Sequence, residues 1–131
     1  MSEPFKIRFA VRFRDVDVLG HVNNAVYFTY METARTEYWL RTFGGNSLEE
    51  LSFIVARAEC DFKSPAHFGD EIEVSIRTAD IRNSSFDWIY EIRNALNGEL
   101  MALGKTIQVF YNHKTQQSSP VPPDIRSKLM A

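Results

Sequence analysis

The sequence predicts an α+β fold in which one antiparallel sheet of five strands wraps around one long helix. Five segments alternate apolar and polar side chains with the period of two that is typical of a half-buried strand. Between the first and second of these segments, residues 25–43 contain no glycine or proline and repeat apolar side chains at helical spacing. A chain of 131 residues suits one fold, so we expect residues 1–131 to form a single domain.

The first strand is expected over residues 5–13, where phenylalanine, isoleucine and valine occupy every second position between lysine, alanine and arginine. The helix is expected over residues 25–43, with Tyr27, Tyr30, Met31, Ala34 and Tyr38 on its apolar face. Asn23 or Asn24 is the expected N-cap, because an asparagine oxygen can accept a hydrogen bond from a free amide of the first turn. Gly44 and Gly45 are expected to end the helix, since glycine adopts the left-handed conformation without a steric penalty.

Four more strands are expected in the second half of the chain, over residues 54–62, 72–77, 86–93 and about 103–111. Asn97 and Gly98 suit the turn of a hairpin between the last two. A short helical turn is expected from Asp124 in the tail. Such a sheet has an unpaired edge and a partly apolar outer face, so we expect a homo-oligomer with a dimer as its minimal unit and a tetramer as the full assembly.

Composition excludes several classes of function. Lysine and arginine total 15 against 17 for aspartate and glutamate, and no run of one sign occurs, so nucleic acid is not an expected partner. No window approaches the roughly 18 apolar residues that a membrane-spanning helix needs. Cys60 is the single cysteine and cannot form an internal disulfide, and residues 1–9 lack the apolar core of a secretory signal, so a cytoplasmic location is expected.

The polar stretch DVDVLGHVNN, residues 15–24, lies between the first strand and the helix. In its wider context, FRDVDVLGHVNNAVYFTYMETAR of residues 13–35, it resembles the opening signature of the 4-hydroxybenzoyl-CoA thioesterase-like branch of the hot dog superfamily, which includes the YbgC-like acyl-CoA thioesterases. The likeness continues through CDFKSPAHFGDEIEV, residues 60–74. The resemblance implies a hot dog thioesterase domain over residues 1–131 that hydrolyses an acyl-CoA to a free carboxylic acid and CoA.

The resemblance also implies two catalytic groups. The second acid of the D-x-D pair, here Asp17, is the catalytic carboxylate, and the backbone amide at the start of the helix, here that of Asn24, polarises the thioester carbonyl. The second role makes physical sense, because the first amides of a helix have no intrahelical partner and carry a partial positive charge. Whether Asp17 attacks the acyl carbon or removes a proton from water stays open at this point.

Gly20, His21 and Asn23 are expected to bind substrate or to hold the loop. Gly20 permits a positive φ or the close approach of a ligand. His21 is a candidate to orient the substrate or Asp17, and equally to hydrogen-bond within the loop. Asn23 is a candidate to tie the loop to the helix. Asp15 is expected to act as a turn residue or as a partner of a neighbouring arginine.

No cofactor and no metal are expected, because Asp15, Asp17 and His21 fall short of a zinc ligand set. The CoA phosphates need cationic partners, and the candidates are Lys63, Arg82, Lys105, His113 and Lys114. Phe86, Trp88 and Tyr90 are expected either to line an acyl pocket or to pack on the helix. Cys60 is expected to be an inert buried thiol, and Glu32 and Arg35 to form a local ion pair.

Three rival functions keep the same fold. The acyl group could arrive on acyl carrier protein instead of CoA. A hot dog dehydratase or hydratase is less consistent with an acid in the first strand-to-helix loop. A binding protein that senses acyl-CoA without cleaving it would have no need of the Asp17 carboxylate. The sequence leaves short-chain, long-chain and aromatic acyl groups all open.

Overall fold

The computed structural model describes residues 3–44 and 52–131. Its elements in chain order are the strand β1 (Phe5–Ala10), the 3-10 turn η1 (Phe13–Asp15), the helix α1 (Asn24–Thr42), the strands β2 (Phe53–Phe62), β3 (Glu71–Ile81), β4 (Ser85–Asn94), β5 (Leu100–Asn112) and β6 (Gln117–Ser118), and the helix α2 (Pro123–Met130).

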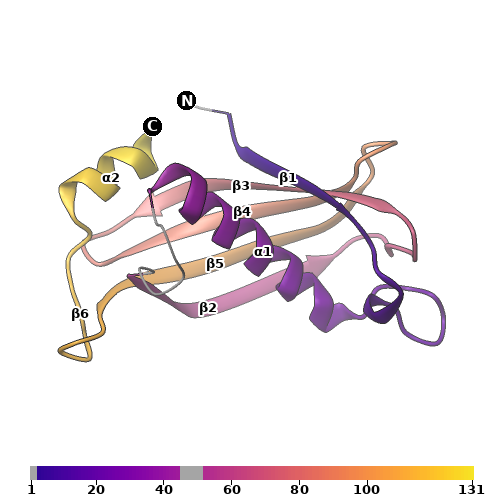
Figure 1. The fold of residues 1–131 in the computed structure, drawn as a ribbon, viewed down its shortest axis with the longest axis horizontal. Coiled ribbons are helices and arrows are strands. Elements are labelled where there is room, and N and C mark those ends of the chain that lie inside the picture. The colour runs from indigo at the N-terminus through magenta and orange to yellow at the C-terminus, as the bar shows by residue number, and fades with distance from the viewer. Residues whose placement is uncertain (1–2, 45–51) are drawn as a thin grey trace.

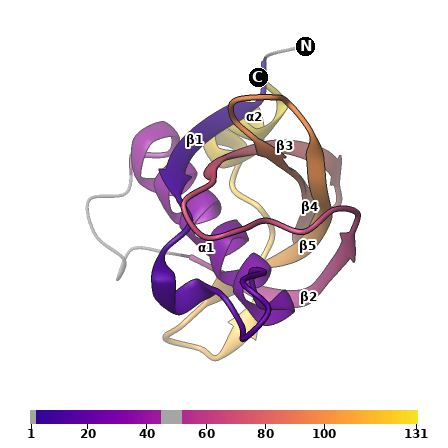
Figure 2. The same cartoon turned by 90° about the vertical axis from the view of Figure 1, so that its right-hand side faces the viewer.

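The strands form one antiparallel sheet in the order β1-β3-β4-β5-β2, and the two-residue β6 pairs with β5. The sheet curls around α1, which crosses its concave face (Figure 1). The view along the strands shows β1, β3, β4, β5 and β2 forming an arc about the helix (Figure 2). The predicted α+β hot dog architecture is therefore confirmed, with β6 and a complete second helix as additions to it.

The first strand ends three residues earlier than expected, at Ala10. Beyond it the Val11 amide donates to the Asp70 carbonyl oxygen at 2.9 Å. The chain then turns, because the Asp15 carboxylate accepts hydrogen bonds from the backbone and the guanidinium of Arg12. Phe13, expected as the last residue of the strand, begins η1 and has its side chain exposed. A side-chain hydrogen bond has overridden the alternating pattern here.

Helix α1 has the expected limits within one residue at each end. Asn23 is the N-cap, and its side-chain oxygen accepts from the Ala25 amide at 3.0 Å. Phe43 is the C-cap, and Gly44 follows with a φ of +76°, the left-handed conformation that commonly ends a helix. Gly45 lies outside the described residues. The buried face of the helix consists of Tyr27, Tyr30, Met31, Ala34 and Trp39, whereas Tyr38 is half-buried.

The core lies between α1 and the concave face of the sheet. On β3 and β4 the inward side chains are fully buried, at Ile72, Val74, Ile76, Phe86, Trp88, Tyr90 and Ile92. Trp88 stacks edge-to-face on Phe53, with ring centroids 5.3 Å apart, and Phe53 in turn contacts Trp39 of the helix. Trp88 packs on Tyr38 of the helix, and Phe86 and Tyr90 are fully buried in the same core, so packing in the core is the expectation that the structure supports.

Strand β2 does not follow the simple alternation expected for residues 54–62. The register shifts between Val55 and Arg57, so that Val55 pairs with Gln108 and Ala58 with Thr106. Gln108 and Thr106 both point into the core, so Val55 and Ala58 share the inner face. A bulge of this kind inserts one extra residue and reverses the facing of the positions before it. Ile54 therefore lies on the outer face of the sheet.

Close packing between α1 and β5 generates a first prediction. A Cβ added at Gly104 would overlap the Met31 Sδ atom, and Met31 is fully buried. We expect Gly104→Ala to lower the free energy of unfolding by about 1–3 kcal/mol, the usual cost of overpacking a core. Chemical denaturation of the variant measures this loss. Met31→Ala is itself destabilising because it empties a buried site, but the double variant should lose less free energy of unfolding than the sum of the two single losses, and additive losses would contradict the proposed clash.

Candidate active site

The loop between η1 and α1 is a closed turn over residues 16–22. Val16 and Val22 form an isolated antiparallel bridge, and the Asp17 amide donates to the His21 carbonyl oxygen at 2.8 Å. The Gly20 amide donates to the Asp17 carbonyl oxygen at 3.0 Å. Gly20 has a φ of +81°, which explains why glycine occupies this position. The turn projects Val18 and Leu19 into solvent and fixes the backbone on both sides of Asp17.

The Asp17 side chain is exposed, but its orientation is set by its own loop. Its Oδ1 atom accepts from the Leu19 amide at 2.9 Å and from the His21 amide at 3.3 Å. Its other oxygen, Oδ2, accepts no hydrogen bond from residues 3–44 or 52–131. One oxygen therefore orients the carboxylate, and the other has its lone pairs available.

At the start of α1, the amides of Ala25 and Val26 donate to the cap residue, whereas the amide of Asn24 does not. The Ala25 amide donates to the Asn23 side chain, and the Val26 amide donates to the Asn23 carbonyl oxygen at 2.8 Å. The Asn24 amide has no acceptor in the described part of the chain. It is thus an available donor at the positive end of a helix of 19 residues.

Asp15 is a structural residue that fixes this arrangement. It is 2% exposed, forms an ion pair of 3.0 Å with Arg12, and accepts from the Tyr30 hydroxyl at 2.9 Å. Burial alone would raise the pKa of Asp15, but the hydrogen bonds from Arg12 and Tyr30 outweigh it and hold the pKa below its ordinary value. Its carbonyl oxygen accepts from the Asn23 amide at 2.9 Å. The prediction that Asp15 pairs with a neighbouring arginine is confirmed.

The segment between β2 and β3 forms the second wall of the site. The Val22 amide donates to the Ala66 carbonyl oxygen at 2.8 Å, and the Ala66 amide donates to the Tyr27 hydroxyl at 3.1 Å. His21 and His67 form an isolated bridge, with their rings edge-to-face at 5.0 Å between centroids. The Asp70 carboxylate accepts from the His67 amide at 2.9 Å. These contacts bring together the two segments that carry the family resemblance, residues 13–35 and residues 60–74.

Between the two walls lies an open cleft of about 360 Å³, lined by Asp17, His21, Val22, Asn24, Tyr27, Phe62, Lys63, Ser64 and Pro65. The structure thus brings three of the expected site residues, Asp17, His21 and Asn24, to one cleft. Gly20 and Asn23 do not line it and instead shape the loop and cap the helix. The sequence assigned Tyr27 to the core, and the structure shows that it belongs to the core and also lines the cleft. A helical pattern does not distinguish burial from contact with a pocket.

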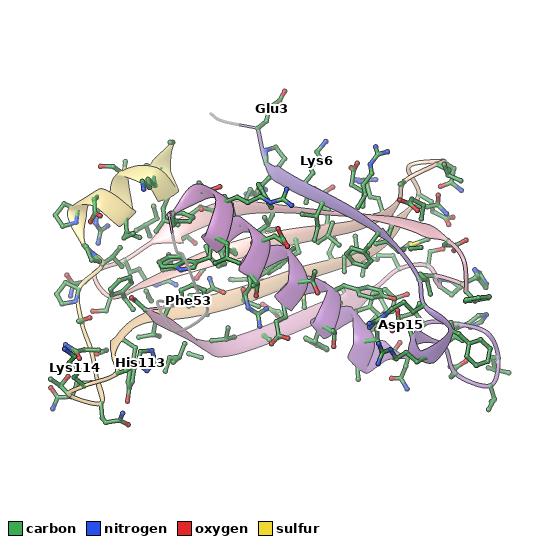
Figure 3. The ribbon with its side chains drawn as sticks, in the orientation of Figure 1. Glu3, Lys6, Asp15, Phe53, His113 and Lys114 are labelled. Atoms are coloured by element: carbon green, nitrogen blue, oxygen red, sulfur yellow. The ribbon has the colours of Figure 1, made fainter. Side chains whose placement is uncertain are left out.

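Of the five cations considered for the CoA phosphates, Lys63 is the one that lines the cleft. Arg82 and Lys105 both pair with the buried carboxylate of Asp87 on another part of the sheet. His113 and Lys114 lie at the opposite end of the molecule from Asp15, next to β6 (Figure 3). Lys63 makes no ion pair with a described residue.

Two further expectations concern single residues. Cys60 is half-buried, and burial, with a smaller effect of Asp61, raises the pKa of its thiol to about 11, so it is a poor nucleophile. Glu32 and Arg35 approach within 3.7 Å, as expected for a local ion pair.

Among the described residues, no three of the metal-binding types His, Cys, Asp and Glu are arranged to hold an ion. The described helices include none with the length and apolarity needed to cross a membrane.

With the fold and the cleft described, comparison with known proteins defines the class. The family model of the thioesterase-like superfamily matches residues 11–129, and the chain belongs to this superfamily of thioester hydrolases. The chain is 32% identical over 92 residues to the acyl-CoA thioesterase YbgC of Helicobacter pylori, covering 68% of this chain and 69% of that protein. The resemblance to the YbgC-like branch is confirmed.

Two more proteins are similar over nearly the whole chain. A thioesterase of Thermus thermophilus, whose crystal structure is a complex with coenzyme A and zinc, is 40% identical with a TM-score of 0.86, covering 96% of this chain and 97% of that one. The chloroplastic acyl-acyl carrier protein thioesterase ATL3 of Arabidopsis thaliana is 29% identical, over 99% of this chain and 70% of that protein.

The Asp15 contacts generate a second prediction. Asp15→Asn loses the charge in the hydrogen bonds to Arg12 and Tyr30, so the free energy of unfolding should fall by about 2 kcal/mol at pH 7. Because the folded-state pKa lies below the ordinary 3.8, this stabilisation is complete above that value and is lost as the pH falls through the lower folded value. Denaturation curves of parent and variant between pH 7 and pH 2 should therefore converge below about pH 4.

The matched control for this prediction is Asp124→Asn, which removes an exposed carboxylate from the first turn of α2. Its stability difference from the parent should be small and should change little with pH. A difference for Asp15→Asn that stayed constant down to pH 2 would contradict the assignment of a buried, charged Asp15.

Proposed function

We propose that the protein is an acyl-CoA thioesterase that hydrolyses an acyl-CoA to a free carboxylic acid and CoA. One observation carries the proposal: Asp17 and Asn24, whose amide has no acceptor among the described residues, line the same cleft. Two relatives support CoA as the carrier, the YbgC protein named as an acyl-CoA thioesterase and the Thermus thermophilus thioesterase in complex with coenzyme A.

In this proposal the Asn24 amide polarises the thioester carbonyl. As a nucleophile adds to the acyl carbon, the carbonyl electron pair moves onto oxygen, and the amide hydrogen bond strengthens with the developing charge. A donor held by the backbone at a helix terminus needs no reorganisation during the reaction. Removal of one such donor typically raises a barrier by roughly 3–4 kcal/mol.

Asp17 supplies the other half of the chemistry. As a general base, its carboxylate takes a proton from water while the water oxygen bonds to the acyl carbon, and the tetrahedral intermediate then expels the CoA thiolate, which receives the proton. As a nucleophile, the carboxylate oxygen bonds to the acyl carbon and displaces the thiolate, and water then hydrolyses the mixed anhydride. Both routes use a carboxylate oxygen with available lone pairs, which Oδ2 provides.

The remaining cleft residues receive supporting roles. His21 lines the same cleft as Asp17, and in this proposal it contacts the thioester or the water. Gly20 acts through its backbone, by allowing the turn at Asp17, and Asn23 acts through its side-chain oxygen, by capping the helix next to Asn24. Lys63 is the candidate partner of a CoA phosphate, because it lies at the cleft without a carboxylate partner among the described residues.

We also propose that residues 1–131 form one domain and assemble at least as a homodimer through β2. A single buried cluster links α1 with the long strands and α2, which supports one domain. Strand β2 ends the order of the sheet, so one of its edges has no partner among the described strands. Ile54, Val55 and Phe62 of this strand are exposed apolar side chains. Pairing of two copies would satisfy the edge and cover these side chains.

A second candidate function keeps the chemistry and changes the carrier to acyl carrier protein. The similarity to ATL3 over 99% of this chain favours it. Comparison of kcat/KM for the same acyl group on CoA and on acyl carrier protein separates the two. Tight binding of several acyl-CoAs without release of thiol would instead indicate a binding protein.

Replacement of Asp17 tests the proposed chemistry. Asp17→Asn keeps an oxygen that can accept from the Leu19 and His21 amides, so the loop should stay folded, but it removes the negative charge. We expect kcat to fall by between about 100-fold and 10,000-fold, the range typical of a lost general acid or base. Release of thiol from a panel of acetyl-CoA, benzoyl-CoA and palmitoyl-CoA measures kcat, and calorimetry with the same compounds measures retained binding.

Asp61→Asn is the matched control, since Asp61 is an exposed carboxylate next to Phe62 that does not line the cleft. It should hydrolyse the panel at the parental rate. Parental turnover by Asp17→Asn would show that Asp17 is not the catalytic carboxylate.

The proposed assembly is tested by mass. The parent chain of 15.1 kDa should sediment as a dimer or a multiple of it. Ile54→Lys places a charge on the exposed side of β2 and should shift the equilibrium toward monomer at micromolar concentration. A parent that stays monomeric at high concentration would refute the assembly and leave the edge of β2 unexplained.

A further inference from the structure

We propose that the Tyr27 hydroxyl is a second catalytic hydrogen-bond donor, which acts with the Asn24 amide on the carbonyl oxygen of the thioester. This inference rests on the proposed thioesterase function and extends it to a residue that the helical pattern assigns to the core. Tyr27 is only 2% exposed, yet it lines the cleft together with Asp17 and Asn24.

The position of Tyr27 on the helix directs its side chain to the reacting end. It is the fourth residue of α1, which begins at Asn24. Helical side chains lean toward the helix N-terminus and cover the preceding turn. The phenol of Tyr27 therefore extends toward the turn that contains the Asn24 amide.

The hydroxyl of Tyr27 has an unused proton. Its oxygen accepts from the Ala66 amide at 3.1 Å. A phenol can also donate one hydrogen bond, and no acceptor for that proton occurs in residues 3–44 and 52–131. Burial, only partly offset by the Ala66 hydrogen bond, raises the pKa of Tyr27, so the hydroxyl keeps its proton at neutral pH.

The other two tyrosines of α1 differ in this respect. The Tyr30 hydroxyl donates to the Asp15 carboxylate at 2.9 Å. Tyr38 lies three turns further along the helix, where its hydroxyl interacts with Thr78. Tyr27 is thus the tyrosine of α1 that lines the cleft and whose hydroxyl proton has no acceptor among the described residues.

The Tyr27 ring is held in place from several sides, which suits a preorganised donor. Its centroid lies 5.3 Å from that of Phe62 and 6.0 Å from that of Tyr30, both in edge-to-face geometry. The Ala66 amide donates to the Tyr27 hydroxyl oxygen, and the Ala66 carbonyl oxygen accepts from the amide of Val22 in the loop of residues 16–22. An N–H donated to the phenol oxygen also polarises its O–H bond and strengthens it as a donor.

Tyr27→Phe tests the inference, with Tyr38→Phe as the matched control that removes a hydroxyl from the far end of the same helix. Hydrolysis of acetyl-CoA, benzoyl-CoA and palmitoyl-CoA is followed by released thiol. We expect kcat of Tyr27→Phe to fall about 100-fold or more, as for the loss of one oxyanion donor, with little change in KM. Tyr38→Phe should retain the parental kcat. Parental kcat in Tyr27→Phe would overturn the inference.

Because Tyr27→Phe also leaves the Ala66 amide without its acceptor, a second variant separates donation from structure. Replacement of Tyr27 with 3,5-difluorotyrosine keeps the oxygen and the ring but makes the phenol more acidic. The activity should then fall at a lower pH than in the parent, where the fluorinated phenol loses its proton. An unchanged pH profile would overturn the inference even if Tyr27→Phe failed to fold.

A spectroscopic measurement distinguishes failure of this inference from failure of the proposed function. The carbonyl stretch of benzoyl-CoA bound to Asp17→Asn should lie at lower frequency than in water and should return toward the water value in Asp17→Asn with Tyr27→Phe. If the parent hydrolyses no acyl-CoA but this frequency shift is present and depends on Tyr27, the hydrolase proposal is wrong, and hydrogen-bond donation by Tyr27 to the carbonyl is supported. If the parent is active and the shift does not depend on Tyr27, the donor fails alone.

Discussion

The first peptide of helix α1 must be held at a fixed point, and the rest of the candidate site depends on this constraint. Its Asn24 amide is useful only if the end of the helix does not fray. The buried Asp15 prevents fraying, because its carbonyl oxygen holds the Asn23 amide and its carboxylate holds the Tyr30 hydroxyl, in the second turn of the helix. The Arg12 guanidinium neutralises the carboxylate, so a charge can be buried under the helix start without large cost.

The site uses the same groups for structure and for chemistry. One oxygen of Asp17 closes its loop, and the other has its lone pairs available. The Asn23 side chain takes up the Ala25 amide and leaves the Asn24 amide without an acceptor among the described residues. Ala66 joins the loop of residues 16–22 to the helix, because its carbonyl oxygen accepts from the Val22 amide and its amide donates to the Tyr27 hydroxyl. The loop and cap hydrogen bonds are made by exposed groups, whereas the Ala66 amide and the Tyr27 hydroxyl pair in a buried position, where an unpaired amide would be destabilising.

The sheet packs along helix α1 and contributes few residues to the cleft. The inward side chains of β3 and β4 are fully buried against α1, and the aromatic cluster around Trp88 lies at the C-terminal end of the helix. The cleft lies at the N-terminal end, where loops meet the end of β2. The rigid core thus holds the helix, and short loops whose polar groups are largely satisfied provide the chemistry.

Local patterns in the sequence determined the strands, the long helix, its Asn23 cap and the order of the elements, because periodicity and capping depend on neighbours a few residues apart. The resemblance of residues 13–35 to the hot dog thioesterases, rather than periodicity, singled out Asp17 and Asn24 as a pair. The bulge in β2, the burial of Asp15 and the contact of His21 with His67 depended on groups far apart in the chain, whereas β1 ended early because of local hydrogen bonds between Arg12 and Asp15. Only the tertiary structure decided that Tyr27 and Lys63 meet Asp17 at one cleft, because a residue's spacing along its own element does not state which distant segment it will face.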